Sequence, residues 1–167
     1  MDANKIIEHF ALEPLEGEGG FYRETYRSGE KIPAAALPGR YSSEKHFATA
    51  IYYLLTPETF SAIHRLVSDE IFHFYLGDPV TMLRLYPDGK GETVILGPDI
   101  EAGQRLQCVV PRGVWQGMFL NPGGQFALMG TTVAPAFDFD DYQTARRDDL
   151  IQKYPDFAKI IQRLTDA

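Results

Sequence analysis

The chain has 167 residues, which is long enough for one domain with a hydrophobic core of its own. Its hydrophobic content of 44% and charged content of 23% are typical of a soluble globular protein. The 23 acidic residues outnumber the 16 basic ones and give a net charge of −7, so the positive surface that a nucleic-acid partner requires is not indicated.

The ends and the cysteine content favour a cytoplasmic protein with no membrane contact. Residues 1–5 lack the basic and then apolar pattern of a signal peptide, and no apolar run approaches the roughly 20 residues of a membrane span. Cys108, the single cysteine, cannot form an internal disulfide. It lies in an apolar, strand-like run, so we expect a small buried core residue rather than a nucleophile.

The first predicted elements are a short helix over residues 3–10, with apolar residues at helical spacing, and a strand over residues 20–27. By alternation Arg23 and Arg27 share one face of this strand. They belong either to a solvated strand edge or to a site in which one of them reaches an anionic ligand or a partner subunit. Residues 28–45 are irregular and predict a loop, either a simple connection or a lid.

From residue 47 to residue 134 the pattern is purely β. Apolar and β-branched runs of strand length are separated by turns rich in glycine and proline, such as residues 87–91 and 121–124. The predicted strands cover residues 47–55, 60–65, 70–76, 80–86, 92–96, 105–110, 114–120 and 126–134. Short strands at this spacing predict an antiparallel sandwich or barrel.

The composition changes after Pro135, where two helices are expected. Asp140 or Asp141 can cap a helix that continues through Tyr154, with its carboxylate placed favourably against the helix dipole. A second helical stretch follows with apolar residues at helical spacing over residues 157–164. We expect both helices to cover an open face of the β domain.

Residues 60–77 carry the clearest sign of a site. They predict two short strands joined by a turn, with His64 before the turn and Glu70 after it. Alternation places Glu70, Phe72 and Phe74 on one face of the second strand. If the two strands pair as a hairpin with these faces together, a histidine and a carboxylate meet over an aromatic floor.

The spacing of His64, Glu70 and Gly77 resembles the first cupin motif, a glycine, five residues, His-x-His, three or four residues, a glutamate, six residues and a glycine. Residues 111–116 are similar to the second motif, proline-x-glycine, two residues and a histidine. The chain as a whole resembles an uncharacterised cupin branch, a domain-of-unknown-function family, over about residues 18–142. The features that carry this resemblance are Glu18–Tyr26, His64-Arg65, Asp69-Glu70, Phe72–Tyr75 with Gly77, and Thr132–Pro135 with Phe137.

The resemblance implies an all-β, double-stranded β-helix, the jelly-roll barrel of the cupins, with short N-terminal and C-terminal helices. It implies a single domain over residues 1–167, with the barrel at about 20–137 and the C-terminal helices at about 140–165. That branch is usually compared with dTDP-sugar 3,5-epimerases, which are jelly-roll dimers. A homodimer is therefore expected, with the strand around Phe21–Arg27 joining the sheet of a neighbour.

The departures from the motifs concern metal ligands. Leu66 stands where a metal-binding cupin has its second histidine, Gln116 stands where the second motif has its histidine, and Glu58 replaces the glycine. Metal catalysis usually needs three or four protein ligands. Only His64, Glu70 and the weak donor Gln116 are left for a divalent metal, so we expect no cofactor and keep this reduced metal shell as an alternative.

Without a metal, His64 and Glu70 can act as a proton-transfer pair, because a nearby carboxylate raises the pKa of a histidine and fixes its tautomer. Tyr52 or Tyr75 could supply the opposing acid, whereas His73 is expected on the outer face of the sheet. Burying Gln116 without a partner would cost about 1–3 kcal/mol, so it should pair with His64, with Glu70 or with a ligand. The candidate ligand-binding residues are Gln116, Phe72, Phe74, Met118 and Arg23.

Three functions follow from these patterns. The first is a metal-independent isomerase or epimerase that acts on a sugar-like or nucleotide-like small molecule with His64 as base. The second is a non-catalytic cupin that binds a small molecule. The third is a metalloenzyme with a His64, Glu70 and Gln116 shell. Fold analogy alone does not choose among them.

Overall fold

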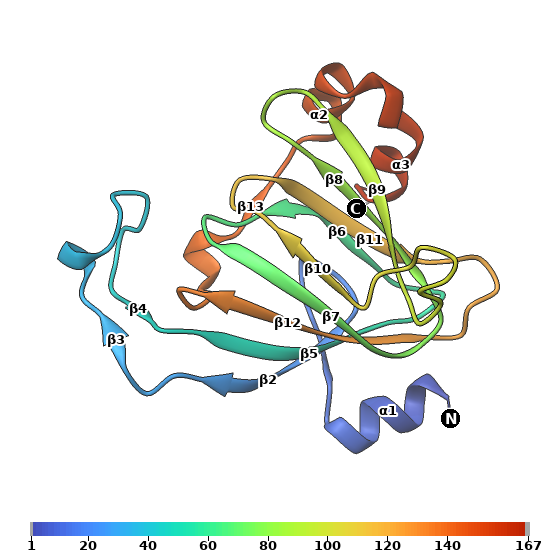
Figure 1. The fold of residues 1–167 in the computed structure, drawn as a ribbon, viewed down its shortest axis with the longest axis horizontal. Coiled ribbons are helices and arrows are strands. Elements are labelled where there is room, and N and C mark those ends of the chain that lie inside the picture. The colour runs from blue at the N-terminus through green and yellow to red at the C-terminus, as the bar shows by residue number, and fades with distance from the viewer. Residues whose placement is uncertain (1, 166–167) are drawn as a thin grey trace.

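Two antiparallel sheets pack face to face in the computed structural model, which describes residues 2–165 (Figure 1). The six-stranded sheet has the order β1 (Glu13–Pro14), β2 (Phe21–Arg27), β5 (Thr49–Leu55), β12 (Ala127–Ala134), β7 (Asp69–Gly77) and β10 (Gln107–Val110). The five-stranded sheet has the order β13 (Gln143–Thr144), β6 (Phe60–Arg65), β11 (Trp115–Leu120), β8 (Val80–Leu85) and β9 (Gly91–Leu96). This is the jelly-roll sandwich that the resemblance implied, and the fold prediction is confirmed.

The core fills the space between the sheets because alternate residues of each strand point inward. Phe72 and Phe74 of β7 and Met118 of β11 belong to this buried cluster. Cys108 of β10 lies in the same cluster, where the prediction placed it.

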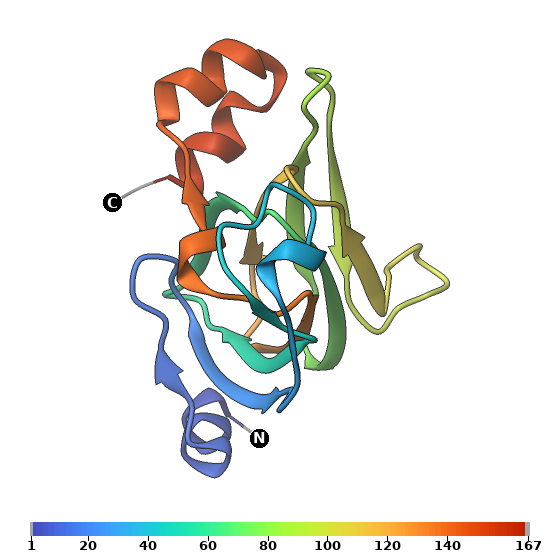
Figure 2. The same cartoon turned by 90° about the vertical axis from the view of Figure 1, so that its left-hand side faces the viewer.

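Helices cover the outer faces of both sheets (Figures 1 and 2). α1 (Ala3–Phe10), predicted from its apolar spacing, packs through Ile6 against the six-stranded sheet. α2 (Arg147–Lys153) and α3 (Ala158–Arg163) pack through Leu150 and Ile161 against the outer face of the five-stranded sheet. A 3-10 turn, η3 (Pro155–Phe157), joins these two helices. None of the helices in the described range is long and apolar enough to span a membrane.

The hairpin expected for residues 60–77 is wrong. β6 pairs with β11 and β13 in one sheet, whereas β7 pairs with β12 and β10 in the other. Residues 66–68 therefore carry the chain from one sheet to the opposite sheet. His64 and Glu70 face each other across the sandwich, not along a shared ladder.

The helix expected to start at Asp140 or Asp141 is also wrong. The chain forms a 3-10 turn, η2 (Phe139–Asp141), then β13, and α2 begins only at Arg147. The carboxylate of Asp141 is not a helix cap because it forms an ion pair with Lys45, at 2.7 Å.

The irregular segment before residue 49 is a connection. It contains a two-stranded ribbon, β3 (Lys31–Ile32) with β4 (Lys45–His46), and a 3-10 turn, η1 (Ala34–Ala36). Residues 28–48 do not contribute to the lining of the cavity described below, so the alternative of a lid is not supported.

Candidate active site

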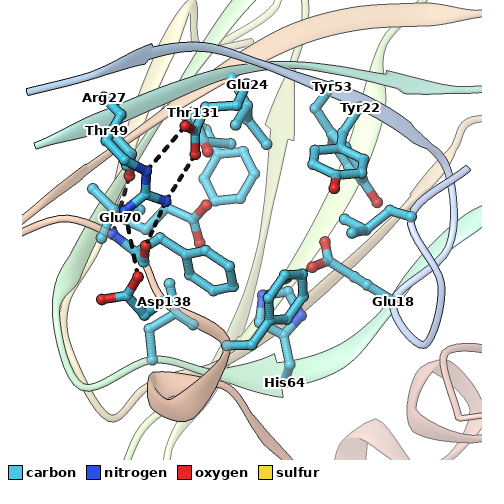
Figure 3. A pocket seen from close by; sticks show the side chains of 17 residues that line it. Glu18, Tyr22, Glu24, Arg27, Thr49, Tyr53, His64, Glu70, Thr131 and Asp138 are labelled. Carbon is cyan, nitrogen blue, oxygen red and sulfur yellow. Dashed lines mark hydrogen bonds and ion pairs between the residues drawn. The ribbon is translucent and has the colours of Figure 1, made fainter. Parts of the chain in front are cut away.

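A cavity of about 160 Å³ lies between the two sheets (Figure 3). Strands β2, β5, β7 and β12 form one wall, β6 contributes to the other, and two connecting segments, residues 15–18 and 137–139, complete it. Of the sequence-predicted residues, His64, Glu70 and Phe72 line this cavity, as does Leu66. Phe74 and Met118 belong to the core and are not in the lining.

His64 is held in one orientation by hydrogen bonds to both ring nitrogens. Its side chain is buried, and Nδ1 lies 2.9 Å from the backbone carbonyl oxygen of Ala62, which can only accept. Nδ1 therefore carries the proton, and Nε2 is left with a lone pair. Nε2 lies 3.3 Å from Nε2 of Gln116 and 3.9 Å from Oε2 of Glu18.

Gln116 lies behind the cavity and links His64 to Glu70. Its strand β11 pairs with β6 so that Gln116 is opposite His64. Its side-chain amide donates to Nε2 of His64 and to Oε2 of Glu70. The expected pairing of Gln116 is therefore present, although Gln116 is not in the cavity lining.

Glu70 is a buried carboxyl on β7 whose pKa is raised above its ordinary value. Burial is the main cause, and the negative charge of Glu18 adds to it. His64 and the Gln116 hydrogen bond act in the opposite direction but do not outweigh burial. A raised pKa keeps this carboxyl closer to the neutral form than an exposed glutamate.

The tyrosine in the cavity is Tyr53, and neither Tyr52 nor Tyr75 lines it. Tyr52 packs on the outer face of the six-stranded sheet against Phe10, with ring centroids 4.7 Å apart, and Tyr75 is 53% exposed beside it. Tyr53 points inward because neighbouring residues of a strand face opposite sides. Its hydroxyl donates to the carbonyl of Gly19 at 2.9 Å, and burial raises its pKa well above the ordinary value.

Arg27 takes the place that was expected for Arg23. The β2–β5 register shifts between Glu24 and Tyr26, which marks a β-bulge and resets the alternation. Arg27 therefore turns into the cavity, whereas Arg23 is exposed outside it and donates to the carbonyl of Phe10 at 3.0 Å. Without the bulge, both arginines would share one face, as the sequence pattern predicted.

Glu18 enters the cavity from the glycine-rich loop before β2. Gly19 has a φ of 98°, and a Cβ there would lie 2.2 Å from the carbonyl oxygen of Phe60, so only glycine fits. This close approach brings Glu18 against β6, where Oγ of Ser61 donates to its Oε1 at 2.9 Å. The sequence pattern gave Glu18 no role beyond the family resemblance, although the glycines that follow it are a signal of close backbone approach.

Residues 137–142 cover the cavity and are held by a buried ion-pair cluster. Phe137, Asp138 and Phe139 line the cavity. The Lys45 side chain has 0% exposure and lies 3.0 Å from Asp138 and 2.7 Å from Asp141. Burial opposes the charge on Lys45, but the hydrogen bonds to these two carboxylates outweigh it and raise its pKa.

Tyr142, at the end of the same segment, stacks on His64, with ring centroids 4.9 Å apart and an interplanar angle of 23°. Burial raises the pKa of Tyr142, and the charges of Glu18 and Glu70 raise it further. The phenol therefore stays protonated beside the imidazole. His73 lies outside the cavity lining, as predicted, with Nε2 3.2 Å from Oγ1 of Thr132.

The three residues expected in a reduced metal shell are hydrogen-bonded to one another in this structure. The amide N–H groups of Gln116 point at Nε2 of His64 and at Oε2 of Glu70, the atoms that would have to coordinate the metal. Among the described residues, no group of three or more histidine, cysteine, aspartate and glutamate side chains is arranged to hold a metal ion.

Comparison with known proteins now places the chain in a family. A family model described as the cupin superfamily (DUF985) matches residues 4–145. The chain belongs to this cupin family. The uncharacterised protein YML079W of Saccharomyces cerevisiae is 32% identical over 144 residues, which cover 81% of this chain and 71% of the relative.

Solved structures support the same assignment. Protein SO0799 from Shewanella oneidensis is similar with a TM-score of 0.87 and 34% identity, over 99% of this cupin and 98% of that chain. A hypothetical protein from Leishmania major matches with a TM-score of 0.88 and 28% identity, over 100% of both chains. Oxalate decarboxylase from Bacillus subtilis shares the fold alone, with a TM-score of 0.54 and 13% identity over 90% of this cupin and 36% of that chain.

Proposed function

We propose that this cupin is a metal-independent isomerase or epimerase that moves a proton at a carbon beside a carbonyl group of a small molecule. The observation that carries the proposal is the orientation of His64, whose Nδ1–H is fixed on a backbone carbonyl while Nε2 keeps a lone pair beside Glu18. The Gln116 amide, which donates to that lone pair, has to give way when the C–H group of a substrate takes its place. A neutral imidazole held in this way can act as a general base through Nε2.

In the proposed step, Nε2 of His64 takes the proton as the C–H bond breaks. The electron pair moves to the carbonyl oxygen and gives an enolate, and the imidazole becomes an imidazolium. The carboxylate of Glu18, 3.9 Å away, and the carbonyl of Ala62 stabilise that positive charge. Return of the proton to the same carbon on the other face gives the epimer, and return to a neighbouring carbon gives the isomer.

The hydroxyl of Tyr53 suits the role of the acid for the developing oxyanion once it turns from the carbonyl of Gly19, to which it donates in this structure. Its raised pKa keeps it protonated, and it lines the same cavity as His64. Glu70 accepts from the Gln116 amide, which also contacts His64, so we assign Glu70 a positioning role for His64.

The size of the cavity limits the reacting part of the ligand. An apolar cavity of about 150 Å³ binds benzene in a well-studied protein. The present cavity, about 160 Å³, therefore suits one six-membered ring, which favours a sugar-sized group. The rest of a nucleotide-like ligand would have to lie outside it.

Deuterium exchange tests the reaction even while the product is unidentified. The protein is incubated in D₂O with a panel of ketoses, oxo-sugars and other carbon acids, and deuterium at carbon is measured by mass spectrometry. Wild type should exchange at least one compound, and His64→Asn should slow that exchange by at least about 100-fold. His73→Asn, on the outer face, is the matched control and should exchange as wild type does. Equal exchange by His64→Asn contradicts the proposal.

The second candidate is a small-molecule-binding cupin without catalysis. The hydrogen bonds of Gln116 to His64 and Glu70 favour it, since they occupy the atoms that act in metal-dependent catalysis. A compound that raises the melting temperature, and that never exchanges a carbon-bound proton, would support this function over the isomerase.

We also propose a homodimer formed through β2. Among the described residues, β1 pairs only with Phe21 and Tyr22, so the edge of β2 over residues 23–27 has no neighbouring strand. An unpaired edge of this length can accept a strand from a second copy. Sedimentation velocity should give a dimer, and a monodisperse monomer at micromolar concentration contradicts it.

A further inference from the structure

Acidic side chains outnumber basic ones in the lining of the cavity. Its lining contains the carboxylates of Glu18, Glu24, Glu70 and Asp138, and Arg27 is the one arginine or lysine among the described lining residues. The neutral form of His64, with Nδ1–H on the carbonyl of Ala62, adds no positive charge.

Arg27 is already engaged by the protein. Its Nε and one terminal nitrogen bind both carboxylate oxygens of Glu24, at 3.0 and 2.8 Å. The other terminal nitrogen lies 3.3 Å from Asp138, and a further bond of 3.1 Å reaches the carbonyl of Phe137. Four of the five guanidinium N–H groups are thereby committed, so Arg27 cannot offer the two-pronged contact that binds a carboxylate or phosphate.

Glu18 is placed differently. Asp138 is neutralised by Arg27 and Lys45, and Glu24 by Arg27. Among the ion pairs of the described residues, Glu18 has none with lysine or arginine, and its nearest basic atom is Nε2 of His64 at 3.9 Å. Figure 3 places Glu18 with Tyr22 and Tyr53 on the side of the cavity away from Arg27.

Aromatic rings supply the remaining wall. Tyr22, Tyr53, Phe72, Phe137 and Phe139 line the cavity. The face of an aromatic ring attracts an organic cation, and the attraction increases when water is excluded. A half-enclosed site with several rings and an uncompensated carboxylate is the arrangement that recognises an ammonium group.

We propose that the ligand of this cavity is a molecule with a body the size of one six-membered ring and a protonated amine, whose charge is held by Glu18 and the aromatic rings. The proposal names the substrate class of the proposed isomerase and in that sense rests on the proposed function. It differs from the anionic ligand for which an arginine of β2 was considered, because that arginine is neutralised from within the chain.

Three ring compounds of nearly equal size provide the test. Benzylamine is protonated at neutral pH, benzyl alcohol is neutral and benzoate is negative. Their affinities for the wild-type protein are measured by calorimetry or ligand-detected NMR. Benzylamine should bind at least about tenfold more tightly than benzyl alcohol, and benzoate most weakly. Equal or tighter binding of either of the other two, or no binding of any of them at millimolar concentration, overturns the proposal.

Matched variants identify the groups responsible. Glu18→Gln should remove about tenfold of the benzylamine affinity and leave benzyl alcohol unchanged, while Glu16→Gln, exposed in the same loop, should leave both unchanged. Phe139→Leu, at a side chain that is 64% exposed, should weaken the binding of benzylamine more than that of benzyl alcohol. If both Glu18→Gln and Phe139→Leu keep the wild-type ratio of benzylamine affinity to benzyl alcohol affinity, the assignment of Glu18 and the aromatic rings as the ammonium site is wrong.

The two proposals fail in different ways. Ammonium selectivity without deuterium exchange leaves the ligand class standing and contradicts the isomerase. Exchange into neutral or anionic compounds, with no ammonium selectivity, supports the isomerase and contradicts the ligand class.

Discussion

The side-chain amide of Gln116 donates a hydrogen bond to the carboxylate of Glu70 across the gap between the two sheets. The same amide reaches His64, so one residue of β11 satisfies polar atoms on β6 and β7. A buried polar group without a hydrogen-bond partner costs free energy. The Gln116 amide removes that cost for Nε2 of His64 and for the carboxylate of Glu70.

Gln116→Leu should therefore destabilise the protein. Loss of the amide leaves Glu70 and His64 short of a partner, at a cost of about 1–3 kcal/mol. Thermal unfolding should shift down by about 2–4 °C for each kcal/mol in a chain of this size. Gln107→Leu removes an exposed amide that contacts His73 and should change stability by less than about 0.5 kcal/mol. Equal shifts for the two variants contradict this role of Gln116.

Glu70 should make stability fall as the pH rises above the ordinary carboxyl pKa of 4.5. Since burial raises its pKa in the folded state, the folded protein binds more protons than the unfolded chain between the two values. Stability present below the unfolded pKa is then lost as the pH rises through the folded pKa. Glu70→Gln lacks this titration, so its stability relative to wild type should increase across the same window. Urea unfolding at several pH values measures it, and a pH-independent difference contradicts it.

Lys45→Met should lower the free energy of unfolding more than most substitutions outside the core. It leaves the buried Asp141 without its ion-pair partner, which costs about 3–5 kcal/mol. Lys31→Met is the matched control, because Lys31 pairs with Glu44 on the surface of the same segment and should lose less than about 1 kcal/mol. Chemical denaturation compares them, and similar losses contradict the role assigned to burial.

Gly19→Ala should destabilise the loop that carries Glu18. The φ of 98° and the 2.2 Å approach of a Cβ to the carbonyl of Phe60 both oppose any larger residue. The strain should cost at least about 2 kcal/mol and weaken ligand binding through displacement of Glu18. Gly39→Ala has open space at its Cβ and should be nearly neutral. Thermal unfolding distinguishes the two.

Removal of metal ions should leave the protein unchanged. Because the Gln116 amide occupies the atoms of His64 and Glu70 that would coordinate a cation, chelator treatment should not alter the melting temperature. Added Zn²⁺ or Mn²⁺ should raise it by less than about 1 °C, since a ligand that binds the folded state tightly would raise it further. A rise of several degrees contradicts the metal-independent proposal.

Most strands could be predicted from the sequence, because alternation and Gly/Pro turns mark each strand by itself. The partner of each strand could not, since a period of two reports which face is buried and not which sheet the strand joins. This explains why residues 60–77 predicted a hairpin. β13 was missed because two residues carry no periodicity, and its partner β6 lies about 80 residues earlier in the sequence.

The candidate site was predicted in part. His64, Glu70 and Phe72 line the cavity, and the motif spacing pointed to the first two. Arg27 replaced Arg23 because a bulge shifts the alternation by one residue, which no local pattern announces. Tyr52 and Tyr53 are neighbours on β5 whose side chains point to opposite faces of the sheet, and only Tyr53 points into the cavity.

Since β6 and β7 belong to opposite sheets, the spacing between the sheets helps to set the separation of His64 from Glu70. Bulkier or smaller core side chains change that thickness, and the hydrogen bonds of Gln116 stretch or compress with it. Divergence of the core among relatives is therefore restricted by the geometry of the site as well as by stability. A substitution deep in the core can therefore shift His64 relative to Glu70 without contacting either residue.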